Sequence, residues 1–348
     1  MTAGKISKIL LAGAACAIAG LVICAINNPG LAAAGWLVGF AFWAQLMVGS
    51  LSLMMIHRLT SGGWGEIIAP VVQSTSMAMP LLLLLALPLF VSIPLLYPWS
   101  HRPDNIKPDV LSAYLNLPGF ILRSMLALVG WSALAFFMPR SGGRRGQLLA
   151  AVGLVFHATV ISILSIDWYL SREAPFTSSS FGASVAVSSL VAALAWAAVW
   201  APAAEDDSAI GDVGALLLAS VLGLTYIDFM AVLVIWYGDL PREAVWLVVR
   251  GRWPWPAIAM IAFVLGSVVP ILALIQSRFR NDRRSLRAIS VSTLAGLAVY
   301  DAYLVVPPSG AVALAPALLA VLGIGTVLIG IVSFGAPWSA SKEPANAR

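Results

Sequence analysis

Long apolar runs with few charges dominate this sequence and limit what it can fold into. A helix that crosses a membrane needs about 20 mainly apolar residues, and ten stretches of this kind follow one another along the chain. They cover residues 8–26, 36–56, 77–97, 115–138, 147–166, 180–200, 212–236, 255–276, 287–305 and 311–333. The third stretch contains Pro80, Pro88 and Pro94, so we expect that span to be kinked.

The overall composition excludes a water-soluble domain. Of the 348 residues, 60% are hydrophobic and only 10% are charged, and the mean hydropathy is +0.94. Soluble domains carry about 25% charged residues. The first apolar run is longer than the roughly 7–15 residues of a signal-peptide core, so we expect a retained helix there. The sequence predicts an all-α integral membrane protein in a lipid bilayer, with no nucleic-acid partner.

The basic residues predict an orientation. With ten spans, thirteen lysines and arginines fall on the same side as the N-terminus and six fall on the opposite side. Because cytoplasmic loops are enriched in basic residues, we expect both termini in the cytoplasm. Residues 57–76, between the second and third spans, are interpreted as a loop on that inner side.

Two similar motifs indicate an internal repeat. "DWYL" at 167–170 and "DAYL" at 301–304 end the fifth and the ninth spans, which are four spans apart and so have the same direction. This spacing predicts two four-helix bundles, spans 2–5 and 6–9, with spans 1 and 10 at the periphery. A chance match remains the alternative, because membrane interfaces favour tryptophan and tyrosine in any protein. The expected divisions are residues 1–34, 35–170, 171–306 and 307–348.

Ionisable side chains inside apolar spans are costly and often functional. Asp228 lies eight residues before Trp236, which places it about 12 Å deeper, near the middle of the membrane. It is a candidate proton carrier or the partner in a structural hydrogen bond. His157, also in mid-span, is either a functional residue or a buried core histidine.

Three further charged residues lie near span ends. Arg123 could extend its head group toward water or pair with Asp167 or Asp301. Both aspartates end their spans, so we expect them at the outer interface, within reach of water or lipid head groups. Each is also a candidate proton acceptor.

His57 ends the second span, and Gln45, Gly49 and Ser52 precede it at helical spacing. This polar and small stripe predicts packing against another helix rather than a pore. There is no Walker A motif, GxGxxG fingerprint or HExxH motif. We therefore expect no catalytic or metal-binding residues in this chain.

Several segments resemble one membrane protein family. "FWAQLMVGSLSLMMIHRLTSGGWG" at 42–65 resembles the second span and following loop of the ActF-type membrane subunit of alternative complex III. That complex is a bacterial quinol:electron-acceptor oxidoreductase, and the subunit is related to NrfD and polysulfide reductase membrane subunits. The similarity continues through "LLYPW", "YLNLPGFILRSM", "IDWYLSREAPFTSSSFG" and "VIWYGDLPREAVWLVVRGRWPW".

The resemblance implies a subunit of the bacterial inner membrane with no covalently bound cofactor and with quinol or quinone as a ligand. Its partners would be a second NrfD-like membrane subunit, an iron–sulfur subunit and multihaem cytochrome c subunits. The proton-transfer or quinol-site candidates are Asp228, Asp167, Asp301, His157, Arg123 and His57. A secondary transporter and a purely structural assembly subunit are the alternatives.

Overall fold

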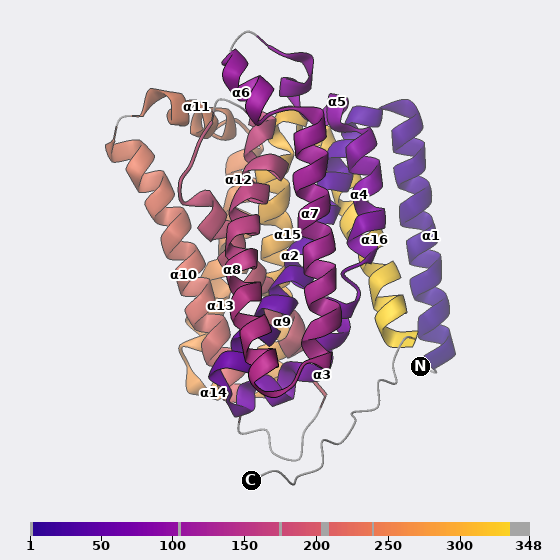
Figure 1. Ribbon diagram of the computed structural model, residues 1–348, viewed down its shortest axis with the longest axis vertical. Coiled ribbons are helices and arrows are strands. Elements are labelled where there is room, and N and C mark those ends of the chain that lie inside the picture. The colour runs from indigo at the N-terminus through magenta and orange to yellow at the C-terminus, as the bar shows by residue number, and fades with distance from the viewer. Residues whose placement is uncertain (1–2, 104–105, 174–175, 203–208, 239, 335–348) are drawn as a thin grey trace.

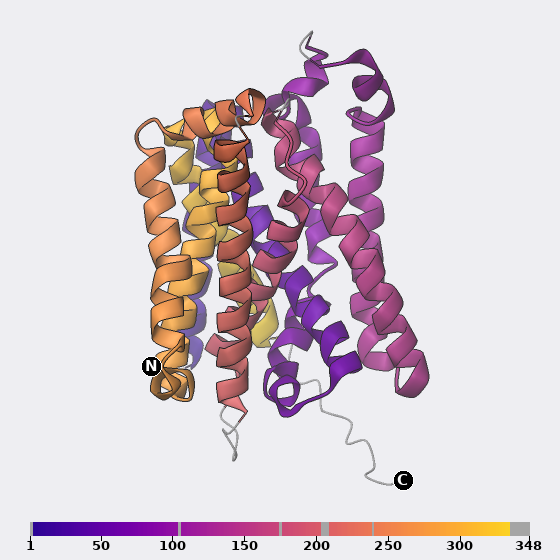
Figure 2. The ribbon, with the colours of Figure 1, turned by 90° about the vertical axis from the view of Figure 1, so that its left-hand side faces the viewer.

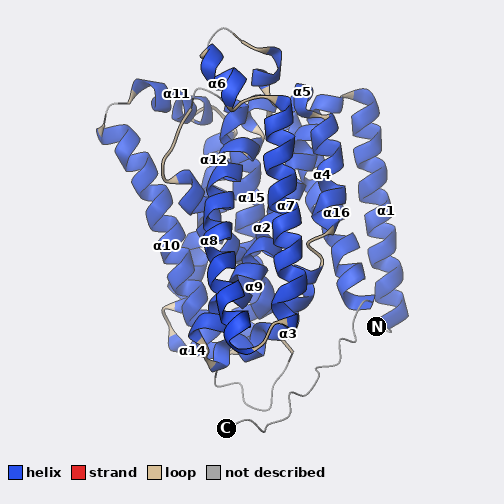
Figure 3. Cartoon of the chain, viewed as in Figure 1, coloured by secondary structure: helices blue, strands red, loops and turns tan. Residues whose placement is uncertain are grey.

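The computed structural model describes residues 3–103, 106–173, 176–202, 209–238 and 240–334. Every regular element in these residues is a helix, as Figure 3 shows. The all-α fold expected from the sequence is confirmed. The predicted cytoplasmic tail, 335–348, lies outside the described residues.

The helices that form the spans follow one another up and down a single bundle axis (Figure 1). They are α1 (Ala3–Asn27), α2 (Pro29–Thr60), α3 (Gly63–Met77), α4 (Leu81–Val91), α7 (Leu117–Phe137), α8 (Gly143–Trp168), α9 (Phe181–Trp200), α10 (Ile210–Tyr237), α12 (Trp255–Phe263), α13 (Val269–Leu274), α15 (Arg283–Val305) and α16 (Leu314–Phe334).

Short helices close the two ends of the bundle. They are α5 (Ile93–Leu96), α6 (Pro108–Ala113), α11 (Pro241–Arg250) and α14 (Ser277–Arg280), and the 3₁₀ turns η1 (Pro98–His101), η2 (Met138–Arg140), η3 (Leu170–Glu173), η5 (Pro307–Ser309) and η6 (Ala311–Ala313). The π-helix η4 (Val264–Val268) instead lies inside a span, between α12 and α13. We call the end that holds the turn between α2 and α3 the lower end, and the end that holds η1 and η3 the upper end, as drawn in Figure 1.

The membrane architecture agrees with the apolar pattern. Among the described residues, eight helical segments are long and apolar enough to cross a membrane, and the pair α3 and α4, bent by 46°, makes a ninth when it is counted as one broken span. The 25-residue helix α1 occupies the place of the first predicted span. It begins, and α16 ends, at the lower end (Figure 1). This is a multi-pass membrane protein.

The third predicted span is broken, as its prolines suggested, but the break lies earlier than expected. Helix α3 already occupies residues 63–77, so the interpretation of 57–76 as a loop was wrong. Its apolar side, with Ile68, Val71 and Val72, is buried, and α3 packs against α2. The composition of this segment resembled that of a loop. Burial of one apolar helix face against α2 stabilises it as a helix instead.

The eighth predicted span is also irregular, because α12 and α13 are joined by the π-helix η4. Gly266 of η4 faces Gly296 of α15 so closely that a Cβ on Gly296 would overlap the backbone of Gly266. The Ser292 hydroxyl donates to the Leu265 carbonyl oxygen at 3.0 Å. The irregular backbone is therefore supported by a tight contact and a side-chain hydrogen bond from the neighbouring helix.

Two groups of neighbouring helices meet along α2 and α9. In one group α2, α4, α7 and α8 pack together, and in the other α9, α10, α12, α13 and α15 do so. A Cβ on Gly49 of α2 would overlap the Ser189 carbonyl oxygen of α9, so the two helices touch at this glycine. The turned view in Figure 2 shows the orange helices of the later part of the chain on one side and the purple to magenta helices, from α3 to α8, on the other. The residue boundaries of the two bundles stay a prediction.

Helices α1 and α16 pack on each other and on α2, at one side of the bundle. A Cβ on Gly39 of α2 would lie 2.7 Å from the Ala320 side chain of α16. Helix α2 is thereby enclosed on all sides. In its apolar stretch of 18 residues 89% are buried, whereas in the corresponding stretch of α10 only 11% are. The polar residues of α2 therefore lie in the core of the protein.

Candidate functional site

A line of polar side chains crosses the junction between the two helix groups. Ser184 Oγ donates to Asp228 Oδ1 at 2.6 Å. One turn further along α9, Ser188 Oγ donates to Gln45 Oε1. Gln45 Nε2 then donates to Asp301 Oδ1 at 2.7 Å. We call these five residues the polar chain. It consists of two hydrogen-bonded groups, Ser184 with Asp228 and Ser188 with Gln45 and Asp301, which lie one helical turn apart on α9.

Local sequence explains how the polar chain is positioned. Ser184 and Ser188 are four residues apart in the apolar helix α9, so both hydroxyls lie on one face. Small residues around them allow α9 to approach α2 closely at Gly49. Gln45 lies four residues before Gly49 on α2, one turn from the closest contact. The polar stripe on α2 therefore faces another helix, as the sequence predicted.

Asp301 is the most enclosed carboxyl group of the polar chain, with 2% of its surface exposed. Its Oδ1 accepts from Gln45 and, at 3.5 Å, from the Tyr169 hydroxyl. Its Oδ2 has no hydrogen-bond partner among the residues that the structure describes. The expectation that Asp301 lies within reach of water or head groups was wrong. A buried carboxyl oxygen without a hydrogen-bond partner destabilises the folded protein, so stability by itself does not explain why this oxygen is there.

Both N–H groups and the carbonyl oxygen of the Gln45 side-chain amide have hydrogen-bond partners. Its two N–H groups donate to Asp301 Oδ1 and, at 2.8 Å, to the Tyr169 hydroxyl oxygen. Its carbonyl oxygen accepts from Ser188. The amide orientation is therefore set by three neighbours on three different elements, which holds Asp301 and Ser188 on either side of it.

Asp167 is buried as well, with 0% exposure, and it is paired rather than free. Arg123 Nε and Nη2 donate to its two oxygens at 2.6 and 3.0 Å. The predicted pairing of Arg123 with Asp167 is confirmed, whereas the predicted interfacial position of Asp167 was wrong. Trp99 and Ser171, hydrogen-bonded at 3.1 Å, belong to the segments that close this end of the bundle. An ion pair with both oxygens occupied is better suited to holding helices together than to relaying protons.

Asp228 is half-buried on α10. The bond from Ser184 agrees with the expected hydrogen bond to a neighbouring helix. The Tyr300 hydroxyl also interacts with this carboxyl group, from the position adjacent to Asp301 on α15. The proton-carrying role of Asp228 stays a prediction.

The two histidine candidates lie apart from the polar chain. His157 is 7% exposed, and its ring packs against Trp131 with centroids 6.0 Å apart. His157 Nδ1 and Trp131 Nε1 have no hydrogen-bond partner in the described residues. His57 Nε2 lies 3.0 Å from the Gly62 carbonyl oxygen at the lower end, and its ring packs on Trp64. The structure therefore brings only Asp228 and Asp301, of the six candidates, into the polar chain.

A second polar cluster at the upper end was not anticipated. Arg250 of α11 donates to both Glu173 oxygens at 3.0 and 2.6 Å and to the Leu304 carbonyl oxygen at 2.9 Å. Arg172 is 3% exposed and donates from Nη2 to Ser309 Oγ at 3.1 Å, but its Nε and Nη1 have no partner among described residues. In the sequence these arginines were counted only as basic loop residues.

Sequence analysis missed the two serines of the polar chain, and it interpreted Gln45 only as a packing residue. A signal was present, because serines four residues apart in an apolar span place two hydroxyls on one buried face. The partner of each serine could not be read from this signal. Tyr169 and Tyr300 were likewise not singled out, because aromatic residues next to an aspartate resemble an ordinary interface motif.

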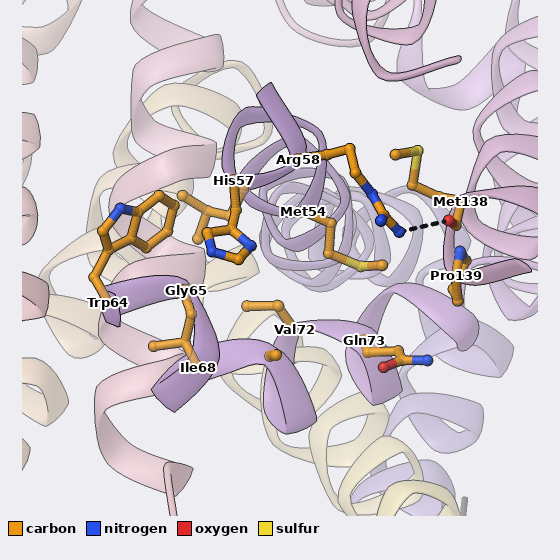
Figure 4. A pocket seen from close by; sticks show the side chains of 12 residues that line it. Met54, His57, Arg58, Trp64, Gly65, Ile68, Val72, Gln73, Met138 and Pro139 are labelled. Atoms are coloured by element: carbon orange, nitrogen blue, oxygen red, sulfur yellow. Dashed lines mark hydrogen bonds between the residues drawn. The ribbon is translucent and has the colours of Figure 1, made fainter. Parts of the chain in front are cut away.

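The cavities differ in what they could hold. Beside the polar chain, a space of about 10 Å³ is lined by Gln45, Trp131, Ser165, Trp168 and Tyr169 among others. It has room for about one water molecule and none for a quinol ring. A pocket of about 180 Å³ lies at the lower end, between α2, α3 and η2 (Figure 4).

Comparison with known proteins does not assign the chain to a family: no protein-family model matches it, and no curated protein does. Over the residues that can be described, no group of three or more His, Cys, Asp and Glu side chains is placed to hold a metal ion. The geometry of the polar chain and the sequence resemblance are therefore the two observations that bear on the function of this chain.

Proposed function

We propose that this chain is a proton-transfer subunit of a membrane-bound quinol:electron-acceptor oxidoreductase of the alternative complex III type. The observation that carries the proposal is the polar chain, whose two hydrogen-bonded groups, one with Asp228 and one with Asp301, follow each other along one face of α9. Charged and polar groups at membrane depth mark proton relays in pumps and transporters. The Asp301 Oδ2 atom is a buried proton-binding position that no neighbour in the described structure occupies.

Each member of the polar chain has a plausible part in a relay. A serine hydroxyl can accept one proton while it donates another, so Ser184 can exchange a proton with Asp228. Transfer from Ser184 to Ser188, one turn along α9, would need a water molecule between them. Gln45 is an amide and does not readily carry a proton, but it holds Asp301 and Ser188 in fixed positions. The space of about 10 Å³ beside Gln45 and Tyr169 has room for a water molecule at the Gln45 end of the polar chain.

The setting of this activity follows from the sequence resemblance. Quinol oxidation releases two protons and two electrons. In a complex of this type, the iron–sulfur and multihaem cytochrome c subunits carry the electrons, and the second NrfD-like subunit is a partner in the membrane. The present chain would supply a proton path in the bacterial inner membrane, with both termini in the cytoplasm.

The first test is the composition of the native complex. Gentle solubilisation of the membrane, followed by affinity purification of this chain, should recover haem-containing and iron–sulfur subunits with a cytochrome absorption spectrum. Recovery of the chain by itself from intact membranes would contradict the assignment to a quinol oxidoreductase.

The second test addresses proton transfer within that complex. In proteoliposomes, Asp301→Asn and Gln45→Leu should lower the number of protons moved per electron, while the complex keeps its subunits and haem content. Asp212→Asn is the matched control, because Asp212 is exposed in the first turn of α10. If both core variants moved protons as the wild type does, only a structural role would remain. If they instead released the partner subunits, the assembly-subunit alternative would be favoured.

Secondary transport is the other candidate function, and the interrupted helices favour it. The break between α3 and α4 and the π-helix η4 lie within membrane spans, and discontinuous helices in each half of a repeat often mark substrate sites. Uptake of a solute by the purified chain alone in liposomes would support this function. Dependence of all activity on haem-containing partners would argue against it.

A further inference from the structure

The lower pocket has apolar walls and a polar rim. It lies where α2 ends, α3 begins and η2 follows α7 (Figure 4). Its volume is about 180 Å³, and it is open on one side. The residues that line it are Leu53, Met54, His57, Arg58, Trp64, Gly65, Ile68, Ala69, Val72, Gln73, Met138 and Pro139.

The charge around the lower pocket is positive. Arg58 is half-buried at its rim, and its hydrogen bond to the Met138 carbonyl oxygen is long, at 3.4 Å. A Cβ on Gly146 would lie 3.6 Å from Arg58 Nε, so the first turn of α8 borders the same rim. That turn contributes the exposed Arg144 and Arg145 and the positive end of the α8 dipole. No acidic residue lines the pocket.

The size of the pocket limits the kind of ligand. Sites that enclose a whole small molecule measure about 300–1,000 Å³, so a pocket of about 180 Å³ would hold only part of a larger molecule. Just before Met138, Phe136 and Phe137 on α7 are 49% and 53% exposed, which provides an apolar surface beside the pocket. An amphiphile could place its head group in the pocket and its chains on this surface.

We infer that the lower pocket binds the phosphate head group of an anionic phospholipid. Arginine donors match phosphate oxygens in charge and geometry, and basic pockets between membrane helices bind anionic head groups. Met54, Val72 and Pro139 would contact the glycerol and the first carbons of the chains. This inference does not depend on the proton-transfer proposal.

Lipid binding to the purified, delipidated protein in detergent tests the inference. Dioleoylphosphatidylglycerol should bind more tightly than dioleoylphosphatidylcholine when retention is measured by native mass spectrometry. Arg58→Gln should weaken binding of the anionic lipid about fivefold, since one basic residue near a lipid surface contributes on the order of that factor. Arg58→Lys should restore most of the affinity, and Ala69→Phe, which fills the pocket without changing charge, should abolish binding.

Arg278→Gln is the matched control, because Arg278 is exposed at the same end of the bundle on α14 and does not line the pocket. This variant should bind the lipid as the wild type does. Equal binding of both lipids, or an Arg58→Gln variant that behaves like Arg278→Gln, would overturn the inference. Saturation by inorganic phosphate alone would indicate a free-anion site, and displacement by decylubiquinone without loss on Arg58→Gln would indicate a quinone site; either result would also overturn it.

Discussion

The buried ion pair between Arg123 and Asp167 allows a stability prediction with a defined magnitude. Arg123 holds both carboxylate oxygens at 2.6 and 3.0 Å, and the side-chain exposures are 20% and 0%. Removing one partner of a buried pair costs about 3–5 kcal/mol, because the other charge remains buried without a partner. Because the Arg123 side chain is 20% exposed and the pair is therefore not fully buried, we expect Arg123→Met to cost about 3 kcal/mol, at the lower end of this range.

The double variant should behave differently from the single one. Arg123→Met together with Asp167→Leu removes both charges, and an apolar pair of similar volume is often neutral or stabilising. We expect the double variant to lie within about 1 kcal/mol of the wild type. The two substitutions are therefore expected to be strongly non-additive.

The measurement is the free energy of unfolding in mixed detergent micelles, with increasing dodecyl sulfate and tryptophan fluorescence as the signal. Trp168, next to Asp167 in sequence, donates to Ser124 Oγ at 3.0 Å, so the signal includes a residue close to the pair. A loss below about 1 kcal/mol for Arg123→Met would refute the reasoning, since surface ion pairs contribute about that much. Additive losses in the double variant would refute it as well.

Three other predictions concern single positions. Gly49→Ala should destabilise the protein by about 1–3 kcal/mol, because a Cβ there would overlap the Ser189 carbonyl oxygen; the same detergent titration measures it, and unchanged stability would contradict the close helix contact. Arg172→Met should be as stable as the wild type or more so, because two buried donors without partners are removed; a clear loss of stability would indicate a partner that balances this charge. Hydrogen bonds from Ser285 lower the pKa of Asp282, which caps α15. The contribution of this cap to the free energy of unfolding is therefore complete above the usual carboxyl pKa. It is lost as the pH falls through the lowered pKa of Asp282 in the folded protein. Thermal unfolding of Asp282→Asn should lack this acid dependence, and an unchanged pH profile would contradict the assignment.

The internal repeat stays a prediction, and its two motifs lie toward the same end of the bundle. Asp167 and Asp301 both end long helices that run from the lower to the upper end (Figure 1). Their surroundings differ, because Asp167 is paired with Arg123, whereas Asp301 is bound by Gln45 and Tyr169. If the two halves share an origin, they have diverged in the chemistry of these carboxyl groups.

The sequence alone determined that this protein lies in a lipid membrane and that its third span is kinked. It also gave the number of spans, except where a helix is short or broken. These properties depend on the length of apolar runs and on the placement of proline, which can be read along one dimension. The pairing of Arg123 with Asp167 was also among its predictions, because a charge within an apolar span needs a partner and few were available.

Only the tertiary structure decided which polar groups meet. Gln45 lies 143 residues from Ser188 and 256 residues from Asp301, yet it hydrogen-bonds both. The buried positions of Asp167 and Asp301 followed from segments that cover the upper end, and a span-by-span interpretation placed both at an exposed interface. Apolar length is a local property of the chain, whereas the burial of a particular side chain depends on which helices pack around it, and close contacts at small residues such as Gly49 set that packing.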